Sequence, residues 1–226
     1  MERPRLAIVV PAYDEDGTIG DVVRAAASYG AVIVVDDHSS DATAEHAGVA
    51  GAHVVRNQAN LGYDRAIERG FAEAERLGAE AVVTLDADGE HDPGALADFR
   101  RLLVDERRPL VLGVRPRKAR VSEWLVGLVI RWQYGIADVL CGMKGYHIEL
   151  YRQNSGFDHV RSIGTELAIA SICRGHPFVE VPVRGRPRGD RPRFGNALSA
   201  NVRILGALWR VTRATTRIAD RGPSNG

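Results

Sequence analysis

The sequence predicts an α/β protein whose mostly parallel sheet is doubly wound and flanked by helices. Three apolar runs of strand length occur early in the chain, at 6–10, 31–35 and 81–85. Each run leads into an acidic loop, and segments with helical spacing separate the runs. This alternation is typical of a parallel sheet, whose ligands bind beyond the carboxyl ends of the strands. We therefore expect the acidic loops to meet at one edge of the sheet.

The first two runs lead into polar loops and then into helices. Pro11 is expected to break the first strand, and the polar loop 12–17 follows it. The segment 18–28 carries apolar residues at helical spacing. After the second run, Ser40 or Asp41 can cap the next helix, because both side chains accept hydrogen bonds from backbone amides.

The loop after the third run is the most informative part of the sequence. Asp86 and Asp88 follow the apolar residues directly, and Glu90 lies two positions further on. Two carboxylates at a strand end cannot both be buried without partners, because unpaired buried charges are costly. Mg²⁺ or Mn²⁺ would balance them, since hard cations take oxygen ligands and keep positions for water and phosphates. His91, in the same loop, is expected to be structural because such cations prefer oxygen.

Four segments resemble, in order along the chain, the signatures of family 2 glycosyltransferases with the GT-A fold. They are VVPAYDE at 9–15, VVDDHSSD at 34–41, NLG at 60–62 and LDADGEHDP at 85–93. The last form and the short chain are most similar to dolichyl- or polyprenyl-phosphate mannose synthases and their glucosyl relatives. Four motifs in register are far more specific than any one of them.

The resemblance implies an inverting, metal-dependent glycosyltransferase that moves a hexose from a GDP- or UDP-sugar to a polyprenyl phosphate. It implies that the base and ribose lie against Pro11, Tyr13, Glu15, Asp36 and Asp37. The diphosphate would be held by Mg²⁺ or Mn²⁺ on Asp88, assisted by Asp86 and Glu90. The metal and Arg188 would neutralise charge developing on the leaving nucleoside diphosphate.

The acceptor side of the resemblance rests on two segments. DVLCGMK, which ends at Lys144, resembles the family segment that borders the acceptor site. Lys144 could meet a phosphate, although a single lysine in a loop is usually just solvated. Glu166 stands where the family carries an acidic residue that opens a helix. The helix dipole favours an acidic residue in a first turn whatever its function, so a structural role and an acceptor-facing role both stay open.

The run VEVPVRGRPR resembles the family's strand followed by an arginine that contacts the donor pyrophosphate. Arg188 is the best positional match, with Arg184 and Arg186 as rivals. Family members usually continue with Gly-x-Ser-Lys, whereas this chain continues with DRPRFG. Arg191 and Arg193 could replace the usual lysine, and the departure leaves the acceptor contacts of this loop in doubt.

The net charge of +1 hides an uneven distribution. Residues 1–110 hold 21 Asp and Glu against 11 Lys and Arg, a balance of about −10, while residues 111–226 hold 8 against 19, about +11. The basic half is expected to meet an anionic partner, either a phosphate-bearing substrate or a membrane surface. We expect no nucleic-acid partner, because the arginine clusters lack interleaved aromatic residues and no nucleic-acid motif is present.

Two segments of the basic half fit a membrane surface. The predicted helix 122–140 carries Trp124 and Trp132, and the helical stretch 197–218 has arginine as its only charged residue type. Each could lie at the interface or be an ordinary core-facing helix. The longest apolar stretch is too short to span a bilayer. We expect a cytoplasmic protein that is peripheral on the cytoplasmic membrane face.

The expected organisation is one glycosyltransferase domain over 1–196. Its nucleotide-sugar and metal half is 1–110, and its acceptor half is 111–196. An amphipathic helix at 197–219 and a disordered tail at 220–226 should follow. The sequence has only two cysteines, which predicts no disulfide framework and fits a reduced cytoplasmic setting.

Three other functions are weighed against this one. A soluble glycosyltransferase acting on a hydroxyl of a small-molecule, glycan or natural-product acceptor would need a general base, for which Glu166 is the obvious candidate. A dinucleotide-dependent oxidoreductase would share the alternating elements, but no Gly-x-Gly-x-x-Gly follows Val10 or Val35. A non-catalytic nucleotide-binding or membrane-docking module is disfavoured by the retained Asp86 and Asp88.

Overall fold

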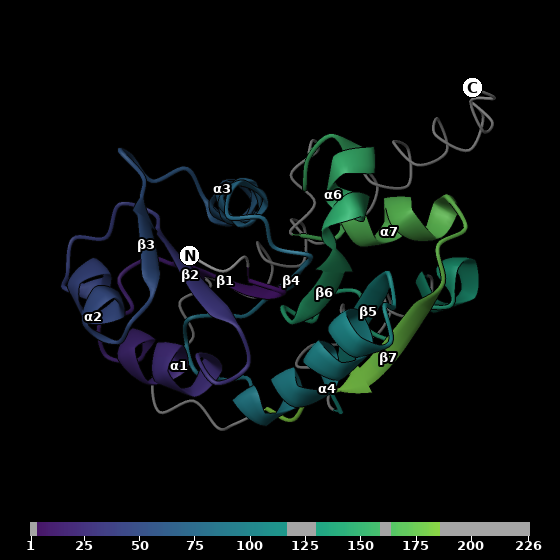
Figure 1. The fold of residues 1–226 in the computed structure, drawn as a ribbon, viewed down its shortest axis with the longest axis horizontal. Coiled ribbons are helices and arrows are strands. Elements are labelled where there is room, and N and C mark those ends of the chain that lie inside the picture. The colour runs from purple at the N-terminus through teal and green to yellow at the C-terminus, as the bar shows by residue number, and fades with distance from the viewer. Residues whose placement is uncertain (1–3, 117–129, 159–163, 186–226) are drawn as a thin grey trace, which may run out of the picture.

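The computed structural model describes residues 4–116, 130–158 and 164–185. Its strands form one seven-stranded sheet in the order β3-β2-β1-β4-β6-β5-β7 (Figure 1). Their bounds are β1 Leu6–Ala12, β2 Ala31–Asp36, β3 His53–Arg56, β4 Ala81–Thr84, β5 Leu110–Val114, β6 Lys144–His147 and β7 Phe178–Pro182. Only β6 runs antiparallel to its neighbours, β4 and β5. The predicted mostly parallel sheet is confirmed.

Helices cover both faces of this sheet (Figure 1). Their bounds are α1 Ile19–Ala26, α2 Thr43–Val49, α3 Tyr63–Arg76, α4 Leu96–Arg100, α6 Ile148–Asn154 and α7 Glu166–Cys173, with short turns η1 Pro93–Ala95 and η2 Arg101–Asp105. Successive strand residues point to opposite faces. Ile8 and Val10 therefore pack with α1, α2 and α4, whereas Ala7 and Val9 pack with α3, α6 and α7. The doubly wound arrangement is confirmed.

The predicted break of the first strand at Pro11 is wrong. β1 continues through Pro11, which pairs with Val35 of β2, to Ala12. The Val9 carbonyl accepts from the Leu85 amide on the β4 side. Because backbone groups alternate along a strand, Pro11 also faces the β4 side, where the pairing has already ended. Its missing N–H therefore removes no bond from the sheet.

The predicted helix 122–140 extends too far. Within the described residues, 130–134 are helical and Gly135 follows with a φ of 75°. The Gly135 amide donates to the Arg131 carbonyl at 3.0 Å, so a glycine in the left-handed region ends the helix. Residues 117–129 lie outside the described residues, as do the predicted helix 197–219 and the tail 220–226.

The two halves of the sequence share this one sheet. β6, a strand of the second half, pairs antiparallel with β4, the last strand that lies wholly in the first half. The loop after β4 is consequently adjacent to the start of β6. Among the described helices, none is long and apolar enough to cross a membrane.

Candidate functional site

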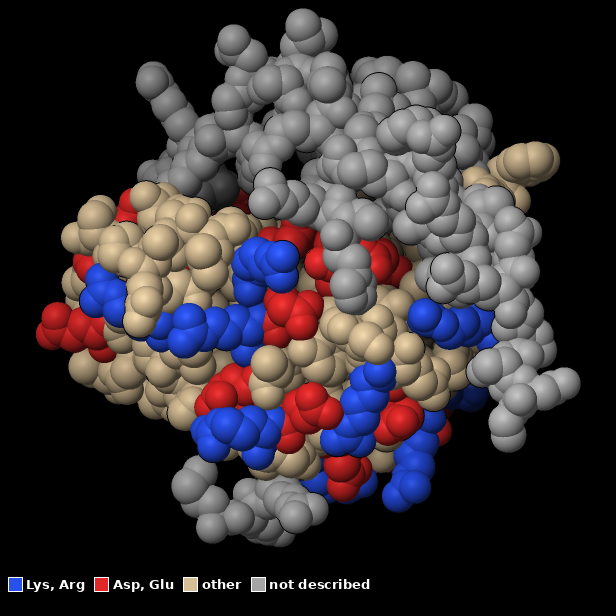
Figure 2. Space-filling view, turned by 90° about the horizontal axis from the view of Figure 1, so that it is seen from above, with Lys and Arg blue, Asp and Glu red and all other residues tan. Residues whose placement is uncertain are grey.

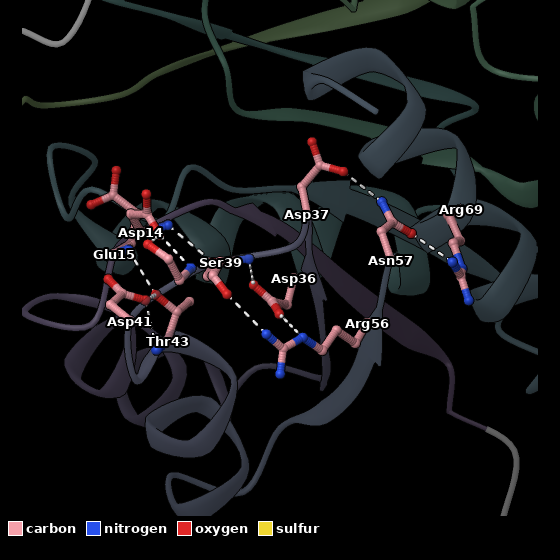
Figure 3. Close-up of polar contacts among 11 residues, drawn as sticks. Asp14, Glu15, Asp36, Asp37, Ser39, Asp41, Thr43, Arg56, Asn57 and Arg69 are labelled. Carbon is pink, nitrogen blue, oxygen red and sulfur yellow. Dashed lines mark hydrogen bonds and ion pairs between the residues drawn. The ribbon is translucent and has the colours of Figure 1, made fainter. Parts of the chain in front are cut away.

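The loops after β1 and β2 are joined into one unit by their own hydrogen bonds (Figure 3). The Asp14 amide donates to Ser39 Oγ at 3.0 Å, and the Glu15 amide donates to Thr43 Oγ1 at 2.7 Å. The Ser40 amide donates in return to Asp14 Oδ1 at 2.8 Å. Asp14 is held in the left-handed region, with φ of 51°. The backbone of both loops is therefore fixed before any ligand binds.

The predicted donor contacts around these loops differ in exposure. Pro11 is buried inside β1, Glu15 is half-buried, and the Tyr13 side chain is 45% exposed. Thr18, just before α1, donates through Oγ1 to the Ala87 carbonyl at 2.8 Å. This bond joins the loop after β1 to the loop after β4, so the two predicted binding loops meet as expected.

Asp36, which the resemblance places against the nucleoside, is the last residue of β2. It is fully buried, and its Oδ2 lies 3.0 Å from Nε of Arg56, its register partner on β3 (Figure 3). Its Oδ1 accepts from the Ser39 amide at 3.1 Å. Since a ligand could not reach Asp36 without a rearrangement, its contacts are those of a structural residue.

Asp37 holds the loop that leads into α3. Its Oδ1 accepts from Asn57 Nδ2 at 2.7 Å and from the Leu61 amide at 2.9 Å. Its Oδ2 accepts from the Gly62 amide at 2.7 Å. The Asn60-Leu-Gly62 motif is therefore attached to the end of β2 through one buried carboxylate. Asn57 is oriented in turn by Arg69, whose Nη1 donates to its Oδ1 (Figure 3).

Asp86 is held on three sides. Tyr63 Oη donates to Asp86 Oδ1 at 3.2 Å, and His91 Nδ1 lies 3.5 Å from Asp86 Oδ2. On the third side is the backbone of Gly142, where an added Cβ would lie 2.0 Å from Asp86 Oδ2. The Asp86 side chain stays 29% exposed, so one part of the carboxylate is open to the site.

Asp88 lies in an environment that disfavours its charged form. Its Oδ1 accepts from the Glu90 amide at 2.9 Å. Burial, reinforced by the neighbouring Asp86 and Glu90 carboxylates, nevertheless raises the pKa of Asp88 above its usual value. A nearby cation would have the opposite effect, because it favours the charged carboxylate.

The predicted three-carboxylate ligand set is not formed. In the described ranges, no three His, Cys, Asp or Glu side chains are gathered closely enough to hold a metal ion. Asp88 accepts from the backbone amide of Glu90, which closes a tight turn between the two residues. The oxygen donors of Asp86 and Asp88 still fit Mg²⁺ or Mn²⁺, which commonly uses one or two carboxylates with substrate phosphates.

The acidic loop is paired with the segment that follows β7. His91 forms an antiparallel bridge with Gly185, and the Asp92 amide donates to the Arg184 carbonyl at 3.0 Å. The side chain of Arg184 is exposed. The other predicted arginines, Arg186, Arg188, Arg191 and Arg193, lie outside the described residues.

Lys144 is not a solvated loop residue, as a single loop lysine was expected to be. It is the first residue of β6, opposite Thr84 of β4, and is only 4% exposed. Burial lowers the pKa of Lys144, and the nearby Cys141, Asp86 and Asp138 act against this shift. Asp138 is itself paired with Arg115, whose Nε and Nη2 contact its two oxygens at 2.7 and 3.0 Å.

Glu166 begins α7 and is only 5% exposed. The turn before it meets the start of α3, because the Gly164 amide donates to Asp64 Oδ1 at 2.8 Å. The sequence reasoning missed Tyr63 and Asp64, although both directly follow the Asn60-Leu-Gly62 motif. Their position immediately after a recognised motif is the signal that could have identified them.

Comparison with known proteins gives consistent matches. The family described as glycosyl transferase family 2 matches residues 7–154. An undecaprenyl-phosphate mannosyltransferase of Micrococcus luteus is 28% identical, and the alignment covers 93% of this chain and 98% of that protein. A polyprenol monophosphomannose synthase of Mycolicibacterium smegmatis is also 28% identical, with 79% and 76% of the two chains covered.

The fold is similar to that of solved glycosyltransferases. The crystal structure of glucosyl-3-phosphoglycerate synthase from Mycobacterium tuberculosis in complex with Mn²⁺, UDP and glucosyl-3-phosphoglycerate has a TM-score of 0.70. It is 22% identical, and the match covers 92% of this chain and 80% of that one. Another crystal structure of the same protein, also with a TM-score of 0.70, contains Mg²⁺ and UDP. At this identity the likeness shows the fold.

Proposed function

Because the chain belongs to glycosyl transferase family 2, we propose that it transfers a hexose from a nucleotide diphosphate sugar to a polyprenyl phosphate, with inversion at the anomeric carbon. That it is a glycosyltransferase with the GT-A fold follows from the family and from its structural neighbours. The donor, the metal, the acceptor and the residue roles are our proposal. The observation that carries it is the Asp86–Asp88 loop, fixed at the carboxyl end of β4 and joined to the arginine-bearing segment after β7.

The donor would lie along the loops after β1, β2 and β4. Tyr13 and Glu15 would contact the base and ribose, and Asp37 would shape this part of the site by holding Leu61 and Gly62. Asp36 and Pro11 are left out of the direct contacts, because both are buried. UDP in the neighbouring glycosyltransferase structures supports a nucleotide-sugar donor.

Asp88 and Asp86 would hold Mg²⁺ or Mn²⁺ against the donor diphosphate. When bound, the cation supplies Lewis-acid stabilisation of the leaving diphosphate. The raised pKa of Asp88 supports this role, since a buried carboxylate among other carboxylates is stabilised by a cation. Arg188 would add a bidentate contact to the same phosphates. The Arg184–Asp92 and Gly185–His91 contacts bring the start of its segment to the acidic loop.

A polyprenyl phosphate acceptor is supported by the two 28%-identical relatives, whose names describe mannosyl transfer to undecaprenyl phosphate and synthesis of polyprenol monophosphomannose. A phosphate oxygen is already anionic at neutral pH and needs no general base. Lys144, opposite the last residue of β4, would add positive charge to the acceptor side without direct contact, because it is buried. Such an acceptor would bring the protein to a membrane surface, where the 89%-exposed Trp132 could make contact.

A soluble acceptor is the alternative, and one observation favours it. The solved structure of similar fold is a glucosyl-3-phosphoglycerate synthase, whose name describes a small phosphorylated product. A hydroxyl acceptor needs a base, and Glu166 at the start of α7 is the candidate.

The two acceptors are distinguished by one assay. Purified protein is incubated with Mn²⁺ and either a GDP- or a UDP-hexose, with no acceptor, with a short polyprenyl phosphate, or with 3-phosphoglycerate. We expect transfer to the polyprenyl phosphate, loss of transfer with chelator, and unchanged transfer in Glu166→Gln. Transfer to 3-phosphoglycerate alone, abolished in Glu166→Gln, would overturn the lipid proposal and leave a soluble glycosyltransferase.

A further inference from the structure

The four residues 61–64, at the start of α3, lie where three loops meet. Two of them, Leu61 and Gly62, donate their amides to Asp37 at the end of β2. The third, Tyr63, donates its hydroxyl to Asp86 after β4, and the fourth, Asp64, accepts from the Gly164 amide before α7. The start of α3 therefore connects the donor side of the site with the acceptor side.

Among the three contacts that hold Asp86, the one from Tyr63 differs in kind. His91 belongs to the same loop as Asp86, and Gly142 limits the carboxylate by steric exclusion. Tyr63 reaches Asp86 from a separate element and donates a directed hydrogen bond at 3.2 Å. A phenol is protonated at neutral pH, so its hydroxyl can donate to a carboxylate. Tyr63 thus fixes one oxygen of Asp86, and the rest of the carboxylate can contact a ligand in the site.

The ring of Tyr63 is itself supported by the acceptor-side turn. An added Cβ at Gly164 would lie 3.6 Å from Cε1 of Tyr63, so the ring packs along the backbone of this turn. Gly164 has a φ of 66° and is bonded to Asp64. Since the ring lies against this turn, the orientation of the hydroxyl depends on a segment that belongs to the acceptor half.

We propose that Tyr63 is a positioning residue that orients the Asp86 carboxylate for the metal–diphosphate complex. The inference rests on the proposed function, because it requires that Asp86 and Asp88 hold a divalent cation. Residues that hydrogen-bond a ligating carboxylate restrict it to the orientation that the metal needs, and their loss commonly weakens metal binding by about 10- to 100-fold. Tyr63 is 39% exposed and its bond is 3.2 Å long, so the lower end, about tenfold, is expected here.

The test compares two Tyr→Phe substitutions that remove the same kind of bond. Tyr63→Phe removes the hydroxyl that donates to Asp86. Tyr151→Phe removes a hydroxyl that donates to Glu68 Oε1 at 2.7 Å, in a contact between α6 and α3 away from the acidic loop. Calorimetry measures the binding of Mn²⁺ with UDP and of Mn²⁺ with GDP, and thermal unfolding is recorded for each variant. The Mn²⁺ concentration for half-maximal transfer is measured separately from kcat.

We expect Tyr63→Phe to weaken binding of the Mn²⁺–nucleotide about tenfold, with little change in melting temperature and with kcat largely restored at high Mn²⁺. Tyr151→Phe should lower the melting temperature and leave Mn²⁺–nucleotide binding as in the wild type. If Tyr63→Phe binds as tightly as wild type while Asp88→Asn does not bind, the inference is wrong and the proposed function stands. If wild type binds neither nucleotide with Mn²⁺, the metal model fails and the inference fails with it.

Discussion

The carboxylates in the joined loops after β1 and β2 and those in the acidic loop after β4 have opposite electrostatic environments. In the first region, Asp36 and Asp37 receive donors from neighbouring backbone and side chains. Burial alone would raise the pKa of Asp41, yet hydrogen bonds from Thr43 and Asp16 leave it below its usual value. In the second region, burial and neighbouring carboxylates raise the pKa of Asp88 in spite of its bond from the Glu90 amide.

This difference distinguishes residues that stabilise the site from residues that are available to bind a ligand. A carboxylate whose charged form the protein already stabilises adds to folding, and its removal should cost stability. A carboxylate whose charged form is disfavoured by the fold is maintained at the cost of stability. Perturbed groups of the second kind are typical of functional sites. The comparison predicts opposite consequences for substitutions in the two regions.

The largest effect is expected at Asp88. Asp88→Asn keeps the size of the side chain and removes the negative charge that would bind a cation, so turnover should fall by about 10³-fold. The melting temperature should stay the same or rise, because a buried charge is removed. Initial rates over a Mn²⁺ series and thermal unfolding provide the measurement. Undiminished turnover that needs no metal would end the metal model.

The second prediction concerns the steric limit on Asp86. Gly142→Ala would place a Cβ 2.0 Å from Asp86 Oδ2, so the carboxylate must move. A misplacement of about 1 Å commonly costs about 10² in rate. Gly48→Ala, where the nearest atom to the new Cβ is 3.9 Å away, serves as the control and should retain wild-type activity. Wild-type turnover in Gly142→Ala would show that the position of Asp86 is unimportant.

The third prediction places Asp36 in the other region. Asp36→Asn removes the negative charge from a fully buried carboxylate that is paired with the exposed Arg56, so the free energy of unfolding should fall by about 2 kcal/mol. Binding of Mn²⁺ with UDP or GDP should be unchanged in the folded protein. Chemical denaturation and calorimetry measure the two quantities. A loss of nucleotide binding with no loss of stability would return Asp36 to the ligand contacts that the sequence predicted.

The fourth prediction gives the pH dependence of the same region. The pKa of Asp41 is lowered in the folded protein, so the stability that its charge contributes is present above its usual value of 3.8 and is lost as the pH falls through the lowered value. Asp41→Asn should lower the free energy of unfolding by about 1 kcal/mol at pH 7, because it weakens the hydrogen bonds that the charged carboxylate accepts. The difference in free energy of unfolding between wild type and Asp41→Asn should decrease below pH 3.8. If this difference stays constant on acidification, the lowered pKa of Asp41 does not contribute to stability.

How well the sequence predicts each region depends on how local its contacts are. The three apolar runs and their acidic ends are local patterns, so their strands and the meeting of their loops could be predicted. The Asp36–Arg56 pair depends on the register of β2 against β3. Tyr63 reaches Asp86 only because α3 packs across the sheet. The Asp36–Arg56 pair has no local signal in the sequence. For Tyr63 the adjacent Asn60-Leu-Gly62 motif marks the position, but not the contact with Asp86.

The predicted charge division depends largely on residues outside the described ranges. On the face that Figure 2 shows, Lys and Arg are interspersed with Asp and Glu among the described residues. Of the 19 basic residues in 111–226, 6 are described, beside 5 acidic ones. The basic surface that a membrane would meet therefore stays a prediction, and it needs an experiment in solution.

The smallest effect is expected at Trp132, outside both loop regions. Trp132 is 89% exposed and lies between Arg131 and Gln133 at the described end of a helix. An indole has an apolar body and one N–H donor, which suits the boundary between headgroups and acyl chains. If a polyprenyl phosphate is the acceptor, this side chain should insert when the protein binds a membrane. Its contribution should be modest, because each basic residue near an anionic bilayer adds about 1 kcal/mol and the predicted helix 197–219 carries several arginines.

Co-sedimentation with anionic vesicles at low salt measures this contribution. Trp132→Ala should reduce vesicle binding about threefold, and a chain ending at Asn196 should lose most of it. Val49→Ala is the control, because Val49 is 83% exposed on α2, which covers the other face of the sheet. Vesicle binding by this variant should match that of the wild type. Trp132→Ala should also leave Mn²⁺–nucleotide binding unchanged, since the donor loops are elsewhere. If the full chain and the chain ending at Asn196 both stay in the supernatant, and Glu166→Gln abolishes transfer to a hydroxyl acceptor, the lipid proposal is wrong and the protein is a soluble glycosyltransferase with Glu166 as the base.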